Sequence, residues 1–120
     1  MREALEASKR DGLPRYETLQ PNYSLVEREP YESDAAPVVR EYGLAVIPYF
    51  SLAAGFLTGK YRRPADAEGK ARAGAVGKYL NARGFAVLEA LDAIAARYEA
   101  TPASVALAWL LAQPNIAAPI

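Results

Sequence analysis

Cysteine and histidine are both absent from the 120 residues. Without cysteine the chain can form neither a disulfide nor a thiolate metal site, and we expect a cytoplasmic protein. Without histidine it cannot contain a Ser-His-Asp triad, a Cys–His pair or a His-ligated metal. We therefore predict no metal site within this chain.

Net charge and long apolar runs are lacking as well. Lys plus Arg and Asp plus Glu each number 14, so no net charge attracts nucleic acid or an anionic membrane. No apolar run approaches the length of a membrane span. The first ten residues are charged and lack the apolar core of a signal peptide. We expect neither a nucleic-acid partner nor a membrane partner.

Apolar residues are abundant, at 52% of the chain. This fraction argues against disorder and favours a packed interior. A chain of this length is enough for one modest domain with one core.

The most informative stretch runs from Leu44 to Tyr61. It opens with a short apolar run, Leu44–Ile47, which predicts a buried strand that Pro48 ends. Small residues, two glycines, two hydroxyls and Lys60 follow. Such a loop lets backbone amides approach an anionic ligand, with the lysine as a point charge for phosphate. An ordinary loop packed at the rim of a barrel is the alternative.

The order of predicted elements indicates parallel βα units. Reading from the N-terminus, helix, strand, helix and strand are expected over Arg2–Lys9, Tyr16–Gln20, Asp34–Tyr42 and Leu44–Ile47. We expect the two strands to lie side by side and parallel. Ser33 or Asp34 is predicted to cap the second helix, with Pro37 in its first turn.

The second half of the chain begins with about twenty residues, 62–81, that show no periodicity. A stretch of this length is a candidate lid or a solvated basic surface loop. An amphipathic helix is predicted over Phe85–Tyr98, with Leu91 and Ile94 in the core. Thr101-Pro102 predicts the start of a well buried helix that places Trp109 in the core, and residues 116–120 begin another strand.

Three segments and the last residues resemble the aldo-keto reductase family. Tyr49–Tyr61 is similar to its Y-S-P-L-x-x-G-x-L-T-G-K-Y segment, and Leu19–Arg28 to its Q-x-x-Y-S-L-x-x-R strand. Thr101–Leu111 matches its T-P-A-x-x-A-L-A-W-L helix, and Ala118–Ile120 looks like the start of its last barrel strand. The motifs occur in the family's order over nearly the whole chain.

This resemblance implies an α/β fold, a partial (β/α)8 TIM barrel with strands six and seven, their helices and the start of strand eight. It implies an NADP-dependent oxidoreductase that reduces a small-molecule aldehyde or ketone. The family's catalytic Asp, Tyr, Lys and His lie in the earlier part of the barrel, so no catalytic residue is assigned here. We therefore expect residues 1–120 to be an inactive, cofactor-binding C-terminal fragment, or alternatively a non-catalytic binding or regulatory fragment.

By the same resemblance, the NADP(H)-binding residues are Gln20, Tyr49, Phe50, Ser51, Leu52, Ala53, Ala54, Lys60 and Arg72. Gln20 would pair with the nicotinamide carboxamide and Tyr49 would stack on its ring. Amides of residues 52–54 would face the pyrophosphate. The family's Ser-Pro after the stacking aromatic is Phe50-Ser51 here, which weakens the case for a hydroxyl contact.

A barrel segment leaves strand edges open. Because the apolar faces that would meet further strands are then uncovered, self-association through exposed strand edges is expected.

Overall fold

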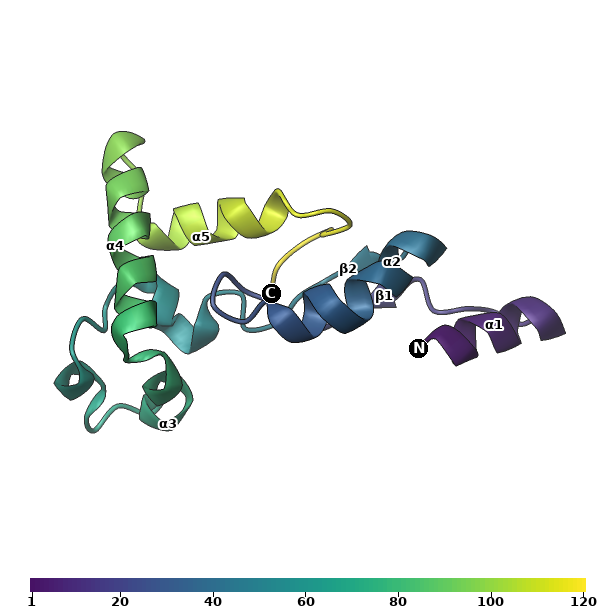
Figure 1. The fold of residues 1–120 in the computed structure, drawn as a ribbon, viewed down its shortest axis with the longest axis horizontal. Coiled ribbons are helices and arrows are strands. Elements are labelled where there is room, and N and C mark those ends of the chain that lie inside the picture. The colour runs from purple at the N-terminus through teal and green to yellow at the C-terminus, as the bar shows by residue number, and fades with distance from the viewer.

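Two short parallel strands form the centre of the molecule (Figure 1). The computed structural model describes all of residues 1–120. β1 (Thr18–Leu19) pairs with β2 (Ala45–Val46) in parallel, the first residue of each strand opposite the first of the other. A parallel bridge between Val46 and Ile116 brings residues 116–120, the C-terminal segment, to the other side of β2. The predicted α/β class and parallel pairing are confirmed.

The chain forms five α-helices: α1 (Arg2–Asp11), α2 (Ala36–Tyr42), α3 (Ala73–Val76), α4 (Ala82–Arg97) and α5 (Pro102–Leu111). Shorter helical turns lie between them: η1 (Tyr31–Ala35), η2 (Ala53–Thr58), η3 (Pro64–Ala67) and η4 (Gly77–Tyr79). The predicted cap of α5 is confirmed, since the Thr101 hydroxyl accepts from the Ser104 amide at 3.1 Å. None of the helices combines the length and the apolar character that crossing a membrane requires.

The start of α2 differs from the prediction. Pro37 does lie in its first turn, but α2 continues from the π-helical turn η1 and has no side-chain cap. Ser33 lies inside η1 and its hydroxyl donates to the Glu29 carbonyl at 2.7 Å, so the predicted Ser33 or Asp34 cap is wrong. Because proline has no amide to donate, the wider turn before it accommodates the missing helical bond.

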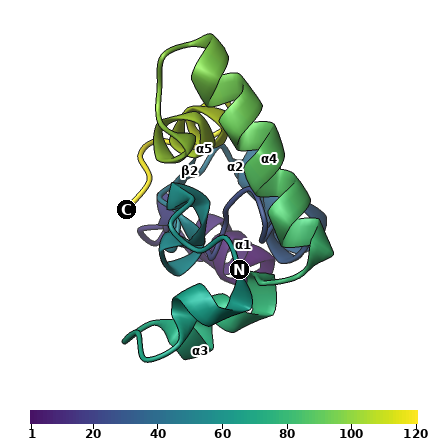
Figure 2. The same cartoon turned by 90° about the vertical axis from the view of Figure 1, so that its left-hand side faces the viewer.

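The interior consists of two separate cores, not the single core expected. The larger core lies around η2, α3 and α4, and the smaller one beneath α1, α2 and the strands. The molecule measures 54 × 32 × 20 Å with a radius of gyration of 16.9 Å. A compact domain of this length has a radius of gyration of about 13.6 Å. The chain is therefore elongated, with α1 at one end and α3 and α4 at the other (Figures 1 and 2).

Residues 62–81 are folded, so the expectation of a stretch without structure is wrong. They form η3, α3 and η4, and they bury Ala67, Val76 and Tyr79 in the larger core. Short turns of this kind carry too few residues to show a period in the sequence, and burial of a few apolar side chains holds them in place. The segment is therefore held against the fold by these three side chains, while most of its other residues, the basic ones included, are exposed.

The last two helices are less buried than their sequences predicted. Leu88 and Leu91 are buried as expected, but Ile94 is 45% exposed and is not a core residue. On α5, burial is complete only at Ala106 and Leu110. The reason is that α5 packs mainly against α4 and η2 and reaches the smaller core only near its end, through Trp109 and Leu110.

Trp109 is half-buried at the joint between α5 and the loop after β1. Its ring centroid lies 5.6 Å from that of Tyr23, and the Arg28 guanidinium lies 5.1 Å from the Trp109 ring. It therefore packs against an aromatic and a cation at the edge of the smaller core.

Gly84, in the first turn of α4, tests the packing of the larger core. A Cβ at this position would lie 1.9 Å from the Tyr79 carbonyl oxygen and 3.0 Å from the Phe56 ring. We expect Gly84→Ala to lower the free energy of unfolding by about 2 kcal/mol, because backbone must move to accept the methyl group. Gly74→Ala on α3 is the matched control, since nothing lies within 4 Å of its Cβ position. In urea unfolding, the free energy of unfolding of Gly74→Ala should rise by about 0.5 kcal/mol. Equal changes in the two variants would contradict the close packing at Gly84.

Glu27 ties the turn after β1 to η4. Its carboxylate forms an ion pair with Lys78 and accepts from the Tyr79 hydroxyl at 2.8 Å. The Lys78 ammonium is the main cause that lowers the pKa of Glu27 below its ordinary value of 4.5. A lowered pKa contributes stability that is present above the ordinary value and is lost as the pH falls through the folded-state value.

We expect Glu27→Gln to lower the free energy of unfolding at neutral pH by about 1 kcal/mol. The difference from the wild type should shrink as the pH falls below 4.5 and vanish below the lowered folded-state pKa, where the wild-type carboxylate is protonated in both the folded and the unfolded state. Urea unfolding at a series of pH values measures it. Glu29→Gln, which alters an exposed side chain without an ion pair, is the control. A difference that does not change with pH would show that the charge of Glu27 contributes nothing.

Candidate functional site

The loop that follows β2 has an unusual backbone. Positive φ angles occur at Phe50 (54°), Ala53 (50°), Ala54 (56°) and Gly55 (95°). Only glycine adopts such angles without strain, so the three non-glycine residues must be held by their surroundings. Ala53 is buried and belongs to the larger core, as does Phe56 just beyond it. The core thus holds a strained loop at the carboxyl end of β2.

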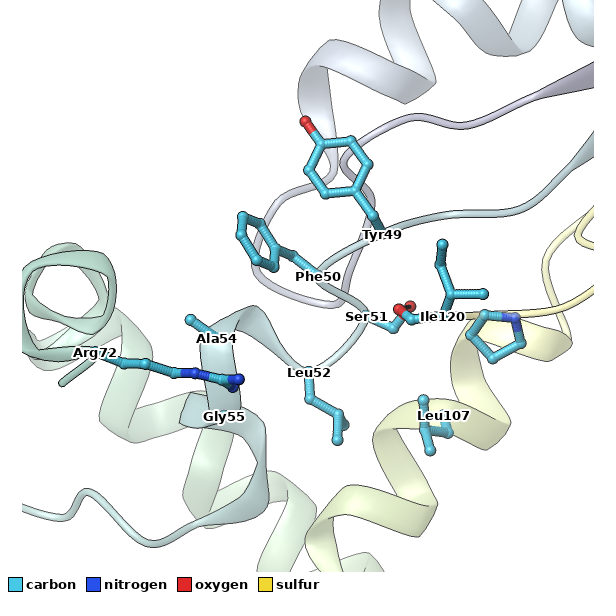
Figure 3. A pocket seen from close by; sticks show the side chains of 10 residues that line it. Tyr49, Phe50, Ser51, Leu52, Ala54, Gly55, Arg72, Leu107 and Ile120 are labelled. Atoms are coloured by element: carbon cyan, nitrogen blue, oxygen red, sulfur yellow. Dashed lines mark hydrogen bonds between the residues drawn. The ribbon is translucent and has the colours of Figure 1, made fainter.

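This loop forms one wall of a pocket of about 510 Å³ (Figure 3). The opposite walls come from the start of α3, from α5 and from the C-terminal segment. The lining residues are Tyr49, Phe50, Ser51, Leu52, Ala54, Gly55, Arg72, Leu107, Pro119 and Ile120. The volume is in the range of small-molecule sites, which is about 300–1,000 Å³.

An aromatic pair stands at one end of the pocket. The ring centroids of Tyr49 and Phe50 lie 5.2 Å apart with an interplanar angle of 63°, an edge-to-face arrangement. Tyr49 is 40% exposed and Phe50 is 56% exposed, although both are large and apolar. Their uncovered surfaces can receive a flat aromatic ligand.

Free backbone amides line the next part of the loop. The amides of Phe50, Ser51 and Leu52 donate no hydrogen bond within the chain. The Ala53 amide, by contrast, donates to the Phe50 carbonyl at 2.7 Å and is occupied in a turn. Consecutive free amides in a turn are suited to binding an anion such as a phosphate.

Two basic residues lie near these amides in different ways. Arg72 lines the pocket, and its side chain extends toward the loop (Figure 3). Lys60 lies behind Gly55, where a Cβ would be 3.3 Å from the Lys60 ammonium nitrogen. The same nitrogen lies 5.1 Å from the centroid of the Tyr61 ring. Arg72 can therefore contact a ligand directly, whereas Lys60 adds positive charge behind the loop.

Gln20 lies just beyond β1 and does not line the pocket. The parallel register continues through a bridge between Asn22 and Tyr49, which places Gln20 opposite Ile47. Because alternate residues of a strand point to the same face, Gln20 and Tyr49 lie on one face of the sheet.

The Ser51 side chain is occupied within the protein. It is buried, and its hydroxyl lies 3.1 Å from both the Pro48 carbonyl and the Ile120 carbonyl. It therefore joins the loop to the C-terminal segment and has no free donor for a ligand. Only the Ser51 amide remains open to the pocket.

Four lining residues were not among the predicted site residues: Gly55, Leu107, Pro119 and Ile120. Leu107 and the C-terminal segment reach the pocket through contacts across more than fifty residues of chain, which local patterns do not encode. The parallel strand order, which was predicted, is the one signal that could have placed the C-terminal segment beside the loop. No group of three or more acidic side chains lies close enough to hold a metal ion.

The profile of the Aldo/keto reductase family matches residues 1–120. Among curated relatives, "Probable aldo-keto reductase 1" from Glycine max is 32% identical over 105 residues, covering 85% of this chain and 30% of that protein. "Protein tas" from Escherichia coli is 36% identical over 116 residues, 94% of this chain and 33% of that protein. The chain belongs to the aldo-keto reductase family. It spans about a third of the length of these relatives.

A solved structure has the same fold. The glycerol dehydrogenase from Gluconobacter oxydans matches with a TM-score of 0.69 at 22% identity, over 96% of this chain and 42% of that chain. At this identity the match supports the fold alone.

Ser51→Ala tests the tie between the loop and the C-terminal segment. The Ile120 amide donates to the Pro48 carbonyl at 3.0 Å, beside the Ser51 hydroxyl. Losing the hydroxyl should lower the free energy of unfolding by about 1 kcal/mol and speed hydrogen exchange at the Ile120 amide. Ser8→Ala, which removes an exposed hydroxyl bonded within α1, should change neither quantity at Ile120. Unchanged hydrogen exchange at the Ile120 amide in Ser51→Ala would show that the Ser51 hydroxyl does not hold the C-terminal segment to the loop.

Proposed function

We propose that this chain binds NADP(H) as the cofactor-binding part of an aldo-keto reductase. The observation that carries the proposal is one pocket that combines uncovered aromatic rings, consecutive free amides and Arg72. A nicotinamide dinucleotide needs these three features, since it has a flat ring at one end and a pyrophosphate in the middle. The residues of the pocket therefore fit the cofactor that the family uses.

Each part of the pocket has a proposed role. Tyr49 stacks on the nicotinamide ring, and Gln20, on the same sheet face, pairs with its carboxamide. The free amides of Ser51 and Leu52 bind the pyrophosphate, with Arg72 as a charged donor. The remaining residues act less directly: Phe50 extends the aromatic wall, Ala53 and Ala54 shape the turn, and Lys60 contributes charge from behind Gly55.

The bound cofactor would supply a hydride from the nicotinamide ring to the carbonyl carbon of a small aldehyde or ketone. The carbonyl oxygen would take a proton from an acid that is not among the residues assigned here. The residues of this chain orient the ring and hold the phosphates, which fixes the direction of transfer without contributing the proton. We therefore propose that the 120-residue chain binds cofactor and does not catalyse reduction by itself.

In this proposal β1 and β2 are the sixth and seventh strands of a (β/α)8 TIM barrel, and the C-terminal segment begins the eighth. The strand order and the match to a glycerol dehydrogenase fold support this numbering. The pocket lies at the carboxyl end of β2, where barrel enzymes place their active sites. The absence of cysteine is consistent with a cytoplasmic protein.

A second candidate function is that of a non-catalytic binding or regulatory subunit. One relative is named "Probable voltage-gated potassium channel subunit beta" from Oryza sativa, and it is 32% identical over 111 residues, 84% of this chain. That name favours a role in which a protein of this fold acts as one subunit of a larger assembly. Cofactor binding without turnover is compatible with both candidates, whereas turnover supports only the first.

Fluorescence titration with NADPH and with NADH tests the proposal. We expect weak binding of both cofactors, and Tyr49→Ala should weaken it about tenfold by removing the stacking surface. Arg72→Met should weaken binding more at low salt than at high salt, because it removes a screened charge. Tyr98→Ala, which removes an exposed ring at the C-terminal end of α4 and outside the pocket, is the control.

The same preparation should show no reduction of a panel of aldehydes with either cofactor. Turnover that Tyr49→Ala abolishes would show that a proton donor lies within the chain. Equal cofactor affinity of the wild type, Tyr49→Ala and Tyr98→Ala would show that the cofactor does not bind in this pocket.

A further inference from the structure

A second pocket lies between α4, α5 and the turn after β1, and we call it the α4–α5 groove. Its volume is about 370 Å³, within the range of small-molecule sites. It shares no lining residue with the pocket beside the strained loop. All of its lining residues lie between positions 25 and 109, so neither terminus of the chain forms a wall of the groove.

Helical spacing explains how the two helices form the walls. On α4, Val87, Leu91 and Ile94 recur at intervals of four and three residues and therefore lie on one side of the helix. On α5, Val105 and Trp109 are four residues apart and line the same groove. The helices cross each other and do not run side by side (Figure 1). Leu91 belongs to the larger core and Trp109 packs against the smaller one, so the groove lies where the two cores meet.

The surface of the groove is apolar and accessible. Seven of its nine lining residues are apolar. Ile94 is exposed, and Val87, Val105 and Trp109 are half-buried. A hydrocarbon chain that lies in such a concave site removes this surface from water, which favours binding. The walls therefore suit a ligand with an aliphatic part.

The other two lining residues are Arg28 and Arg83, and no acidic side chain lines the groove. Arg83 forms no ion pair within the chain. The carboxylate of Glu27, which faces the same turn of α4, is occupied by Lys78 and the Tyr79 hydroxyl. The guanidinium of Arg83 is therefore available to an anion.

Arg28 is held in place by two contacts. Its Nε and Nη2 donate to the Glu32 carboxylate at 2.8 and 3.3 Å, and its guanidinium lies 5.1 Å from the centroid of the Trp109 ring. These contacts use two of the three nitrogens and leave Nη1 as a donor without a partner. Because Glu32 balances the charge of Arg28, the net positive charge of the groove comes from Arg83.

We propose that the α4–α5 groove binds a medium-chain aliphatic carboxylate. Its hydrocarbon chain covers Ile94 and the neighbouring aliphatic side chains, and its carboxylate accepts hydrogen bonds from Arg83, with Nη1 of Arg28 as a further donor. One unpaired arginine balances one negative charge, which favours a carboxylate over a doubly charged phosphate. The proposal does not depend on the cofactor site.

Tryptophan fluorescence measures binding directly. Trp109 is the only tryptophan of the chain and it lines the groove. Titration with octanoate should give a saturable change in its emission. Hexanoate should bind about tenfold more weakly, because it lacks two methylene groups that octanoate buries. Octylammonium, which has the same chain and the opposite charge, should bind more weakly than octanoate at low salt.

Two pairs of variants test the two parts of the groove. Arg83→Gln should weaken octanoate binding about tenfold at low salt and less at high salt. Arg97→Gln is its matched control, since Arg97 is also an exposed arginine of α4 and lies outside the groove. Ala90→Phe fills the groove and should weaken octanoate binding about tenfold or more. Ala93→Phe adds the same ring at an exposed position of α4 outside the groove and should leave octanoate affinity unchanged.

Circular dichroism shows whether each variant is folded, and four outcomes would overturn the proposal. The first is the lack of a saturable change with octanoate, and the second is octylammonium binding that is as tight as octanoate binding. The third is equal octanoate affinity of each groove variant and its control. The fourth is displacement of octanoate by excess NADP⁺, which would place octanoate in the cofactor pocket, or by a lower concentration of an acidic amphipathic peptide, which would assign the groove to a protein partner.

Discussion

The parallel backbone ladder on both sides of β2 is the interaction on which the rest of the structure depends. On one side the Tyr49 amide donates to the Pro21 carbonyl at 2.9 Å, and on the other the Ile120 amide donates to the Pro48 carbonyl at 3.0 Å. These two bonds lie at the carboxyl end of β2, where the strained loop begins. They hold three distant segments of the chain at one point, and two of these, the loop after β2 and the C-terminal segment, line the pocket.

The loop itself is stable only because it is packed. Ala53 and Ala54 have left-handed backbone angles that are unfavourable for residues with a Cβ, by roughly 1 kcal/mol or more each. Both are buried, and Phe56 and Leu57 next to them are fully covered by the larger core. Apolar burial therefore offsets the strain. The outcome is a turn whose amides at Ser51 and Leu52 stay free, which a regular helix or strand would not allow.

The division into two cores explains the shape and the open surfaces of the molecule. The larger core stabilises η2, α3 and α4, while the smaller one attaches α1 and α2 to the sheet. Neither core covers the second face of the sheet or the outer edge of β1. A strand pair in a closed barrel is buried on both faces, and here only one face is.

The sequence by itself determined the local elements and the family. Short-range chemistry is enough for Thr101 to begin α5 and for Gly43 to end α2 with φ 63°. The motif around Tyr49 was enough to locate the loop that lines the pocket.

Tertiary structure alone decided two things. Pairing with a distant part of the chain commits the Ser51 hydroxyl to Ile120. The presence or absence of a covering element decides that Val76 is buried and Ile94 is exposed, although both are apolar residues in helices. A side chain's chemistry is local, but its burial and its hydrogen-bond partner depend on what the rest of the chain brings next to it.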